Sequence, residues 1–148
     1  MQQLSNSIRR MWEEKPLSLA IILAIIVRLL AVIFARGFGM HDDHFLVVEV
    51  PHSWAVGRDY NSWLPWSEGN QGPSGHSLFY PGLQYLFFCF FEKLNITSPQ
   101  IQMFFNRLLH AAFSLITIIA GYRITKKISG KKAAALLALL LAVLWFQP

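Results

Sequence analysis

An uninterrupted apolar run near the N-terminus constrains the fold of this chain more than any other feature. Residues 17–35 read LSLAIILAIIVRLLAVIFA, and Arg28 is their only charged side chain. As an α-helix this segment extends about 28 Å at about 1.5 Å per residue, which suits a hydrocarbon core roughly 30 Å thick. A cleaved signal peptide would have a shorter apolar core and a more purely basic N-terminal region. We therefore predict a transmembrane helix at 17–35.

Two further apolar segments follow. Residues 101–124 (IQMFFNRLLHAAFSLITIIAGYRI) are long enough for a second span, and residues 133–148 (AAALLALLLAVLWFQP) provide the start of a third. Apolar residues make up 54% of the chain and charged residues only 14%, a balance that excludes an ordinary soluble domain. The expected fold class is an all-α membrane protein with about three transmembrane helices and juxtamembrane helices in a large first extracytoplasmic loop.

The basic residues predict the orientation of these spans. Three of them lie in residues 1–16, and four lysines lie in the stretch TKKISGKK at 125–132. Because positive charge collects on the cytoplasmic side of a membrane, we expect both segments in the cytoplasm and residues 36–100 in an extracytoplasmic loop. Six acidic and two basic residues occur between 37 and 100. The net charge of +5 therefore reflects membrane topology, and we expect no nucleic-acid partner.

Residues 77–94 (SLFYPGLQYLFFCFFEKL) are also strongly apolar. A spanning helix here would place the lysines of 125–132 on the outer side, and its uninterrupted apolar run is short for a span. We interpret the segment as a helix lying on the outer membrane face, with a spanning helix as the alternative. Cys89 is the only cysteine of the chain, so no intrachain disulfide can form.

The most concentrated polar cluster is MHDDHF at residues 40–45, shortly after the first span. Adjacent carboxylates raise each other's pKa, so Asp42 or Asp43 could act as a general base near neutral pH. If a helix starts here, Asp43 points away from Asp42, and Phe45 shares a face with Glu49. The alternative is that one of the two aspartates only caps a helix over 44–50.

The same cluster contains histidines. Histidine and aspartate can ligate a transition metal. The candidates here are His41, Asp43 and His44, with His52 or His76. An HxxH pair without a glutamate is not a zinc-protease motif, however. We therefore predict no metal site and keep His41 and His44, together with Glu49, as candidate substrate-binding residues.

Two arginines lie inside the predicted spans. Arg28 is in the first span and Arg107 is in the second, and both fall in the outer half of the bilayer because the two helices run in opposite directions. Charge inside a membrane is costly and marks a functional site unless the side chain reaches the headgroups by itself. We predict that they bind the phosphate of an anionic lipid, with such snorkelling as the alternative.

This arrangement resembles a family, the polyprenol-dependent membrane glycosyltransferases with the GT-C fold. Residues 39–57, GMHDDHFLVVEVPHSWAVG, look like the His-Pro-Asp-Glu-His-Phe motif of the Alg9 and GPI mannosyltransferase branch, with Asp42 and Asp43 at the acidic positions. The motif departs from the family at the proline and in having Asp for Glu. Residues 80–143 are similar to the family's proline-containing juxtamembrane helix, arginine-bearing second span and basic cytoplasmic turn. Protein O-mannosyltransferases and lipid A aminoarabinose transferases share this layout.

The resemblance implies an inverting transferase. Such an enzyme moves a sugar, mannose in several members, from a polyprenyl-phosphate donor to a hydroxyl of a glycan, lipid or protein at the outer face, and needs no cofactor besides that lipid-linked donor. Asp43 would be the base, with Asp42 next to it, and Arg107 or Arg28 would bind the phosphate. Family members are several times longer, so we expect residues 1–148 to be the N-terminal part of a GT-C fold without activity of its own.

A non-catalytic membrane protein is the rival interpretation. A small three-helix subunit or scaffold, whose outer loop binds a partner, would use Asp42 and Asp43 as helix caps. It fits the length of 148 residues. It gives no reason for two span arginines at the same depth near an acidic loop.

Overall fold

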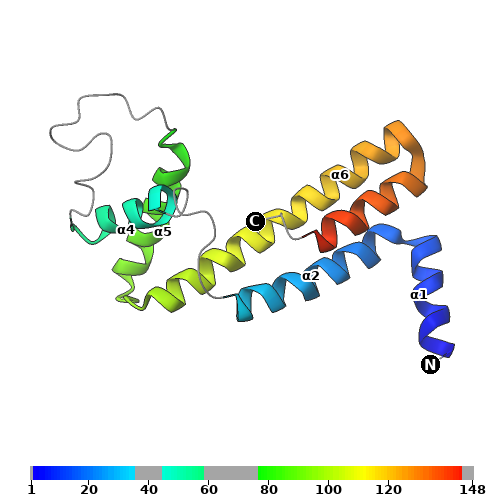
Figure 1. The fold of residues 1–148 in the computed structure, drawn as a ribbon, viewed down its shortest axis with the longest axis horizontal. Coiled ribbons are helices and arrows are strands. Elements are labelled where there is room, and N and C mark those ends of the chain that lie inside the picture. Colours follow the sequence, from blue (N-terminus) through cyan, green and yellow to red (C-terminus); the bar gives the residue numbers. More distant parts are fainter. Residues whose placement is uncertain (1, 36–44, 59–76, 145–148) are drawn as a thin grey trace. The chain divides into compact units, whose positions relative to one another are not determined.

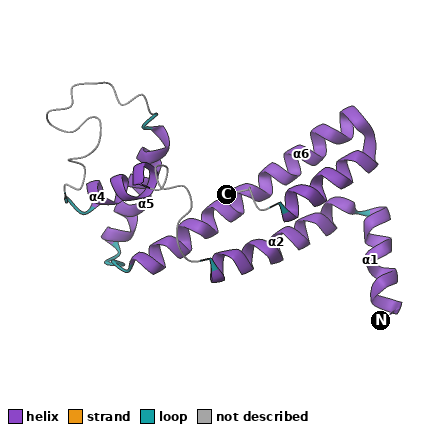
Figure 2. Ribbon diagram, viewed as in Figure 1, coloured by secondary structure: helices purple, strands orange, loops and turns teal. Residues whose placement is uncertain are grey.

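The computed structural model describes residues 2–35, 45–58 and 77–144, and helices make up most of them (Figures 1 and 2). No strand occurs in these three ranges, which confirms the predicted all-α fold class. The chain divides into two compact units. We call Met1–Ala35 with Phe104–Pro148 the span unit, and Arg36–Met103 the loop unit. The helices in chain order are α1 (Gln2–Glu14), α2 (Pro16–Phe34), the π-helical turn η1 (Phe45–Glu49), α4 (Val50–Ala55), α5 (Phe79–Lys93) and α6 (Pro99–Val143).

Two helices, α2 and α6, are long and apolar enough to cross a membrane. The fraction of residues buried in their most apolar windows is only 17% and 11%. The core helix of a soluble protein would instead bury most of such a window, whereas α2 and α6 leave most of their apolar side chains outside the protein core. Both helices agree with the predicted membrane protein.

Helix α6 folds back on itself at Gly130 (Figure 1). Its φ of +81° and ψ of 176° lie in a region that essentially only glycine adopts. The first arm of α6 is residues 99–129, and the second arm is residues 131–143. The four lysines of residues 125–132, which the sequence predicts in a cytoplasmic turn, therefore lie in the two helix ends beside Gly130.

The core of the span unit is a seam, made mostly of alanines, between α2 and the two arms of α6. Small residues let helix backbones approach closely, which is how helices associate inside lipid. At Gly121, on the first arm, even an added Cβ would lie 3.0 Å from Cδ1 of Leu141. The buried residues of this alanine seam are Ala20, Ala24, Ile118, Tyr122, Ala134, Ala138 and Ala142.

The N-terminal helix α1 is an element that we did not predict. Ion pairs one turn apart support it, with Nε of Arg9 3.2 Å from Oε1 of Glu13, and Nε of Arg10 2.9 Å from Oε1 of Glu14. It ends before Pro16, because a proline disfavours the helical conformation of the residue that precedes it. Pro16 is then the first residue of α2, where its missing N–H costs no helical hydrogen bond.

In the loop unit, η1 and α4 form one short helical segment that packs on α5. Pro51, in the first turn of α4, has no N–H to donate to a carbonyl one turn earlier, and its ring crowds that carbonyl. The wide turn of η1 directly precedes this proline and accommodates it. Pro51 and Ser53 are buried, and Oγ of Ser53 donates to the Val50 carbonyl at 2.8 Å.

The end of α5 is fixed by a Schellman motif. Asn95 adopts a positive φ of 56°, its N–H donates to the Glu92 carbonyl, and the N–H of Ile96 donates to the Phe91 carbonyl, each at 3.0 Å. Asparagine tolerates this left-handed conformation better than most residues. The motif turns the chain directly into the start of α6.

Candidate functional site

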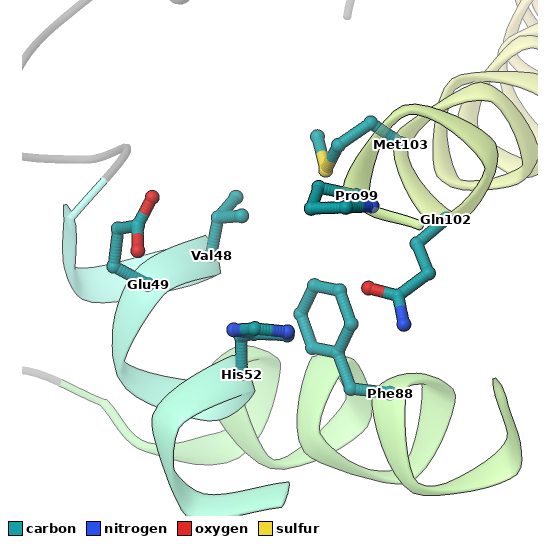
Figure 3. A pocket seen from close by; sticks show the side chains of 7 residues that line it. All are labelled: Val48, Glu49, His52, Phe88, Pro99, Gln102 and Met103. Carbon is teal, nitrogen blue, oxygen red and sulfur yellow. The ribbon is translucent and has the colours of Figure 1, made fainter. Parts of the chain in front are cut away.

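A cavity of about 160 Å³ lies inside the loop unit (Figure 3). Its walls come from the helical segment η1–α4, from α5 and from the first turns of α6. The segment that forms one wall begins at Phe45, the last residue of the acidic cluster MHDDHF. The lining residues are Val48, Glu49, His52, Phe88, Pro99, Gln102 and Met103.

Glu49 and His52 are the ionisable side chains of this cavity. They are three residues apart and therefore lie on one face of the η1–α4 segment, as Figure 3 shows. The His52 ring packs edge-on against Phe88, with ring centroids 5.1 Å apart and an interplanar angle of 78°. This contact fixes the imidazole between the two helices, while the Glu49 carboxylate is exposed. Together they present a carboxylate acceptor and an imidazole that can donate or accept.

Gln102 forms the opposite polar wall. Its side chain is almost fully buried at 1% exposed, and its amide nitrogen donates to the Ile96 carbonyl at 2.8 Å and to Oε1 of Glu92 at 3.5 Å. These bonds leave its side-chain oxygen as an acceptor on the cavity side. Sequence reasoning missed Gln102 and the role of His52, because the cavity joins elements about fifty residues apart in the chain.

A second contact joins α4 to α5. The rings of Trp54 and Tyr85 lie edge to face, with centroids 6.4 Å apart. The pKa of Tyr85 is raised above its ordinary value. The causes are a hydrogen bond to the Cys89 thiol, the charge of that thiol when it ionises, and partial burial. The phenol of Tyr85 therefore stays neutral. The two ring contacts, His52 with Phe88 and Trp54 with Tyr85, attach α4 to α5 at two places.

The acidic cluster itself lies outside the described residues. The predicted catalytic residues Asp42 and Asp43 and the predicted substrate-binding residues His41 and His44 all fall in 36–44. Of the predicted loop residues, the structure places Glu49 at the cavity. Within 2–35, 45–58 and 77–144, no group of three His, Cys, Asp or Glu side chains is arranged to hold a metal ion.

Arg28 is bonded within the span unit. Nε donates to the Ser114 hydroxyl, Nη1 to the Ala142 carbonyl at 3.0 Å, and Nη2 to the Leu141 carbonyl at 3.2 Å. These carbonyls belong to the last turn of α6, where helical partners are missing. The phosphate-binding role of Arg28 stays a prediction, and the bonds add a structural role that the sequence did not indicate.

Arg107 differs from Arg28 in its surroundings. Its Nε is buried and has no hydrogen-bond partner among the described residues. A buried donor without a partner is costly, so such groups call for an explanation, often a ligand. One turn further along α6, Nδ1 of His110 donates to the Asn106 carbonyl at 2.8 Å, which commits that imidazole to the helix. Arg107 is therefore the span arginine better placed to bind an anion.

Comparison with known proteins identifies the family of this chain. No curated protein and no solved structure matched the chain. The model of the Alg9-like mannosyltransferase family matches residues 19–147, which include most of α2, all of α6, the acidic cluster and the residues that line the loop-unit cavity. Because this match extends over most of the 148 residues, the chain belongs to the Alg9-like mannosyltransferase family of membrane glycosyltransferases.

Proposed function

We propose that this chain takes part in the transfer of mannose from a polyprenyl-phosphate donor to an acceptor hydroxyl at the extracytoplasmic face of the membrane. Membership of a mannosyltransferase family supports the class of reaction. The observation that carries the proposal further is the loop-unit cavity, whose first lining residue, Val48, follows the acidic cluster 40–45 by three residues in the chain. One wall of that cavity is the helical segment with Glu49 and His52.

Covalent geometry links the acidic pair to this cavity. Only His44 separates Asp43 from Phe45, the first residue of η1. Consecutive Cα atoms lie about 3.8 Å apart, so the two Cα atoms cannot be more than about 8 Å from each other. This short separation along the chain from the segment that carries Glu49 supports the proposal of Asp43 as the base and Asp42 as its neighbour.

The proposed reaction is a single displacement at C1 of the sugar. The base removes the proton of the acceptor hydroxyl while the oxygen forms its bond to C1, and the bond from C1 to the phosphate oxygen breaks. The products are the new glycoside, with inverted configuration, and the polyprenyl phosphate. A cation offsets the charge that develops on the departing phosphate, and Arg107, with its buried and unmatched Nε, is our candidate.

The cavity residues are proposed to recognise the sugar or acceptor hydroxyls. Glu49 accepts hydrogen bonds, His52 donates or accepts, and the Gln102 side-chain oxygen accepts. Phe88 offers an apolar ring face beside them. A site built to pair with hydroxyl groups discriminates strongly against analogues that lack them, because its own polar groups would then be left unmatched.

The decisive experiment replaces Asp43 by Asn in the intact protein and measures mannose transfer from synthetic polyprenyl-phosphate mannose in isolated membranes. Loss of a general base lowers the rate by about 10²- to 10⁴-fold, and this is the expected result. Asp42→Asn, measured in parallel, shows which carboxylate has the larger effect. Asp59→Asn, an identical change elsewhere in the same outer segment, is the matched control and should leave the rate unchanged.

Three results would contradict the proposal. Full transfer by Asp43→Asn and Asp42→Asn would exclude both as the base. Transfer from a nucleotide-linked mannose but not from the polyprenyl-phosphate donor would show that the donor class is wrong. A protein that is inactive with either donor, yet is required for the activity of a partner, would restore the interpretation as a non-catalytic subunit.

A further inference from the structure

We propose that the span unit binds an anionic phospholipid of the cytoplasmic leaflet in a second cavity, at its basic end. This cavity has a volume of about 430 Å³. It lies where the end of α1, the start of α2 and the start of the second arm of α6 meet. Its lining residues are Trp12, Glu13, Pro16, Lys131, Lys132, Ala135 and Leu136.

The walls of this cavity combine two kinds of chemistry. Trp12, Pro16, Ala135 and Leu136 make it mainly apolar. Its charged lining residues are Lys131, Lys132 and Glu13, and the Glu13 carboxylate is paired with Arg9, so the lining has a net positive charge. A phospholipid has the same two parts, an anionic headgroup and acyl chains. A free anion would use the lysines and leave the apolar walls without a function, so the lining favours a lipid.

The position of the cavity along the helices also favours a lipid. Pro16 is the first residue of the candidate span α2, and Leu136 lies in the apolar second arm of α6. Leu136 and Leu140 are 56% and 53% exposed, so an apolar surface continues from the cavity along that arm. A headgroup at the cavity would leave its acyl chains on this surface, and tryptophan is enriched at that level of a bilayer.

The charge around the cavity matches an anionic headgroup. Residues 1–16 and 123–132 contain eight Lys and Arg and two Glu, a net charge of +6. The two glutamates are each paired with an arginine of α1, at 3.2 Å and 2.9 Å. Clusters of lysine and arginine beside a span attract the anionic lipids of the cytoplasmic leaflet. The same basic residues predict that this end of the span unit lies on the cytoplasmic side.

The two lysines of the cavity have different roles. Nζ of Lys131 donates to the Glu13 carbonyl at 2.7 Å and to the Glu14 carbonyl at 3.4 Å, which satisfies the last turn of α1 and closes the cavity on that side. Lys132 is exposed and lines the same cavity. We therefore assign the headgroup phosphate mainly to Lys132, with Lys131 as the residue that holds α1 in place.

The test titrates the intact protein, purified in detergent, with three probes by isothermal calorimetry. These are dihexanoyl phosphatidylserine, dihexanoyl phosphatidylcholine and inorganic phosphate. We expect phosphatidylserine to bind at least about fivefold more tightly than phosphatidylcholine, since one lysine near anionic lipid is worth about that factor, and phosphate not to bind. Equal binding of the two lipids would overturn the proposal. So would phosphate binding as tight as that of phosphatidylserine, because the site would then recognise a free anion.

Variants separate a defined site from diffuse surface attraction. Lys132→Gln should weaken phosphatidylserine binding about fivefold, while Lys127→Gln, which removes the same charge from a lysine that does not line the cavity, should leave it unchanged. Trp12→Ala keeps every charge and should also weaken binding, through the apolar wall. Equal losses in Lys132→Gln and Lys127→Gln would overturn the proposal, and this comparison decides the matter even if Trp12→Ala lowers the melting temperature.

Discussion

Nε of Arg28, on α2, donates a hydrogen bond to Oγ of Ser114, on the first arm of α6. The same guanidinium donates to the Leu141 and Ala142 carbonyls of the second arm. One side chain thus links the three helical segments of the span unit. Lipid offers no alternative partner to a polar group, so bonds of this kind are retained once the helices meet.

Replacing Arg28 by Met should lower the free energy of unfolding by about 1–3 kcal/mol, because two terminal carbonyls lose their partner. The measurement is thermal unfolding of the purified protein in detergent. Arg123→Met, which removes an exposed arginine from α6, is the matched control and should change the melting temperature little. Equal melting temperatures for the two variants would contradict the structural role of Arg28. A raised KM for the donor in a stable Arg28→Lys variant would show that Arg28 also binds phosphate.

Replacing Arg107 by Met should reduce kcat/KM for the polyprenyl-phosphate donor by about 10- to 100-fold. A hydrogen bond to a charged group is worth about 1.5–3 kcal/mol, and about 1.4 kcal/mol corresponds to a factor of ten. Inhibition by the product polyprenyl phosphate should also weaken in this variant, which a purely structural role would not produce. Unchanged kinetics together with unchanged product inhibition would remove Arg107 from the phosphate site.

Replacing Gly130 by Ala should destabilise the fold-back of α6 by about 1–3 kcal/mol, because φ of +81° with ψ of 176° is closed to residues with a Cβ. The added methyl group itself meets no atom within 4 Å, so the cost is that of backbone strain alone. Gly82→Ala is the control, since it also meets no atom but lies in helix α5 without a positive φ. It should be neutral or stabilise by up to about 1 kcal/mol. Thermal unfolding distinguishes the two.

The orientation in the membrane can be tested with single cysteines in a Cys89→Ser background. Ser129→Cys should resist a membrane-impermeant thiol reagent in intact cells, because the basic end is expected in the cytoplasm. Ser77→Cys should react, because the loop is expected outside. Both positions are exposed in the structure, so burial would not explain a lack of labelling. Labelling at 129 would reverse the orientation and make residues 77–94 a span.

The long apolar segments were predictable because run length alone identifies them. The expected span at 17–35 corresponds to α2, Pro16–Phe34, and the expected interfacial helix at 77–94 contains α5, Phe79–Lys93. Helix α1 was missed, although its Arg–Glu pairs four residues apart were a readable signal. The fold-back was expected as a turn of eight residues and occurs at one glycine, since the lysines around it are good helix formers.

The cavity of the loop unit could not be predicted from the sequence. Glu49 and His52 are three residues apart, and their shared face follows from helical spacing. Their approach to Gln102, however, depends on the Schellman turn at Asn95 and on the packing of α4 against α5. The bonds of Arg28 were unpredictable for the same reason, because Ser114 and Ala142 are distant in the chain and only tertiary packing brings them together.

The alanine seam of the span unit determines which substitutions this part of the protein can accept. Lipid tails are as apolar as leucine, so these helices gain by fitting together rather than by leaving water. A change such as Ala138→Leu, which hydropathy would rank as harmless, inserts a wedge between backbones, whereas the polar but small Ala138→Ser still fits. At these positions the membrane reverses the usual rule of a protein interior, and volume rather than polarity separates tolerated residues from damaging ones.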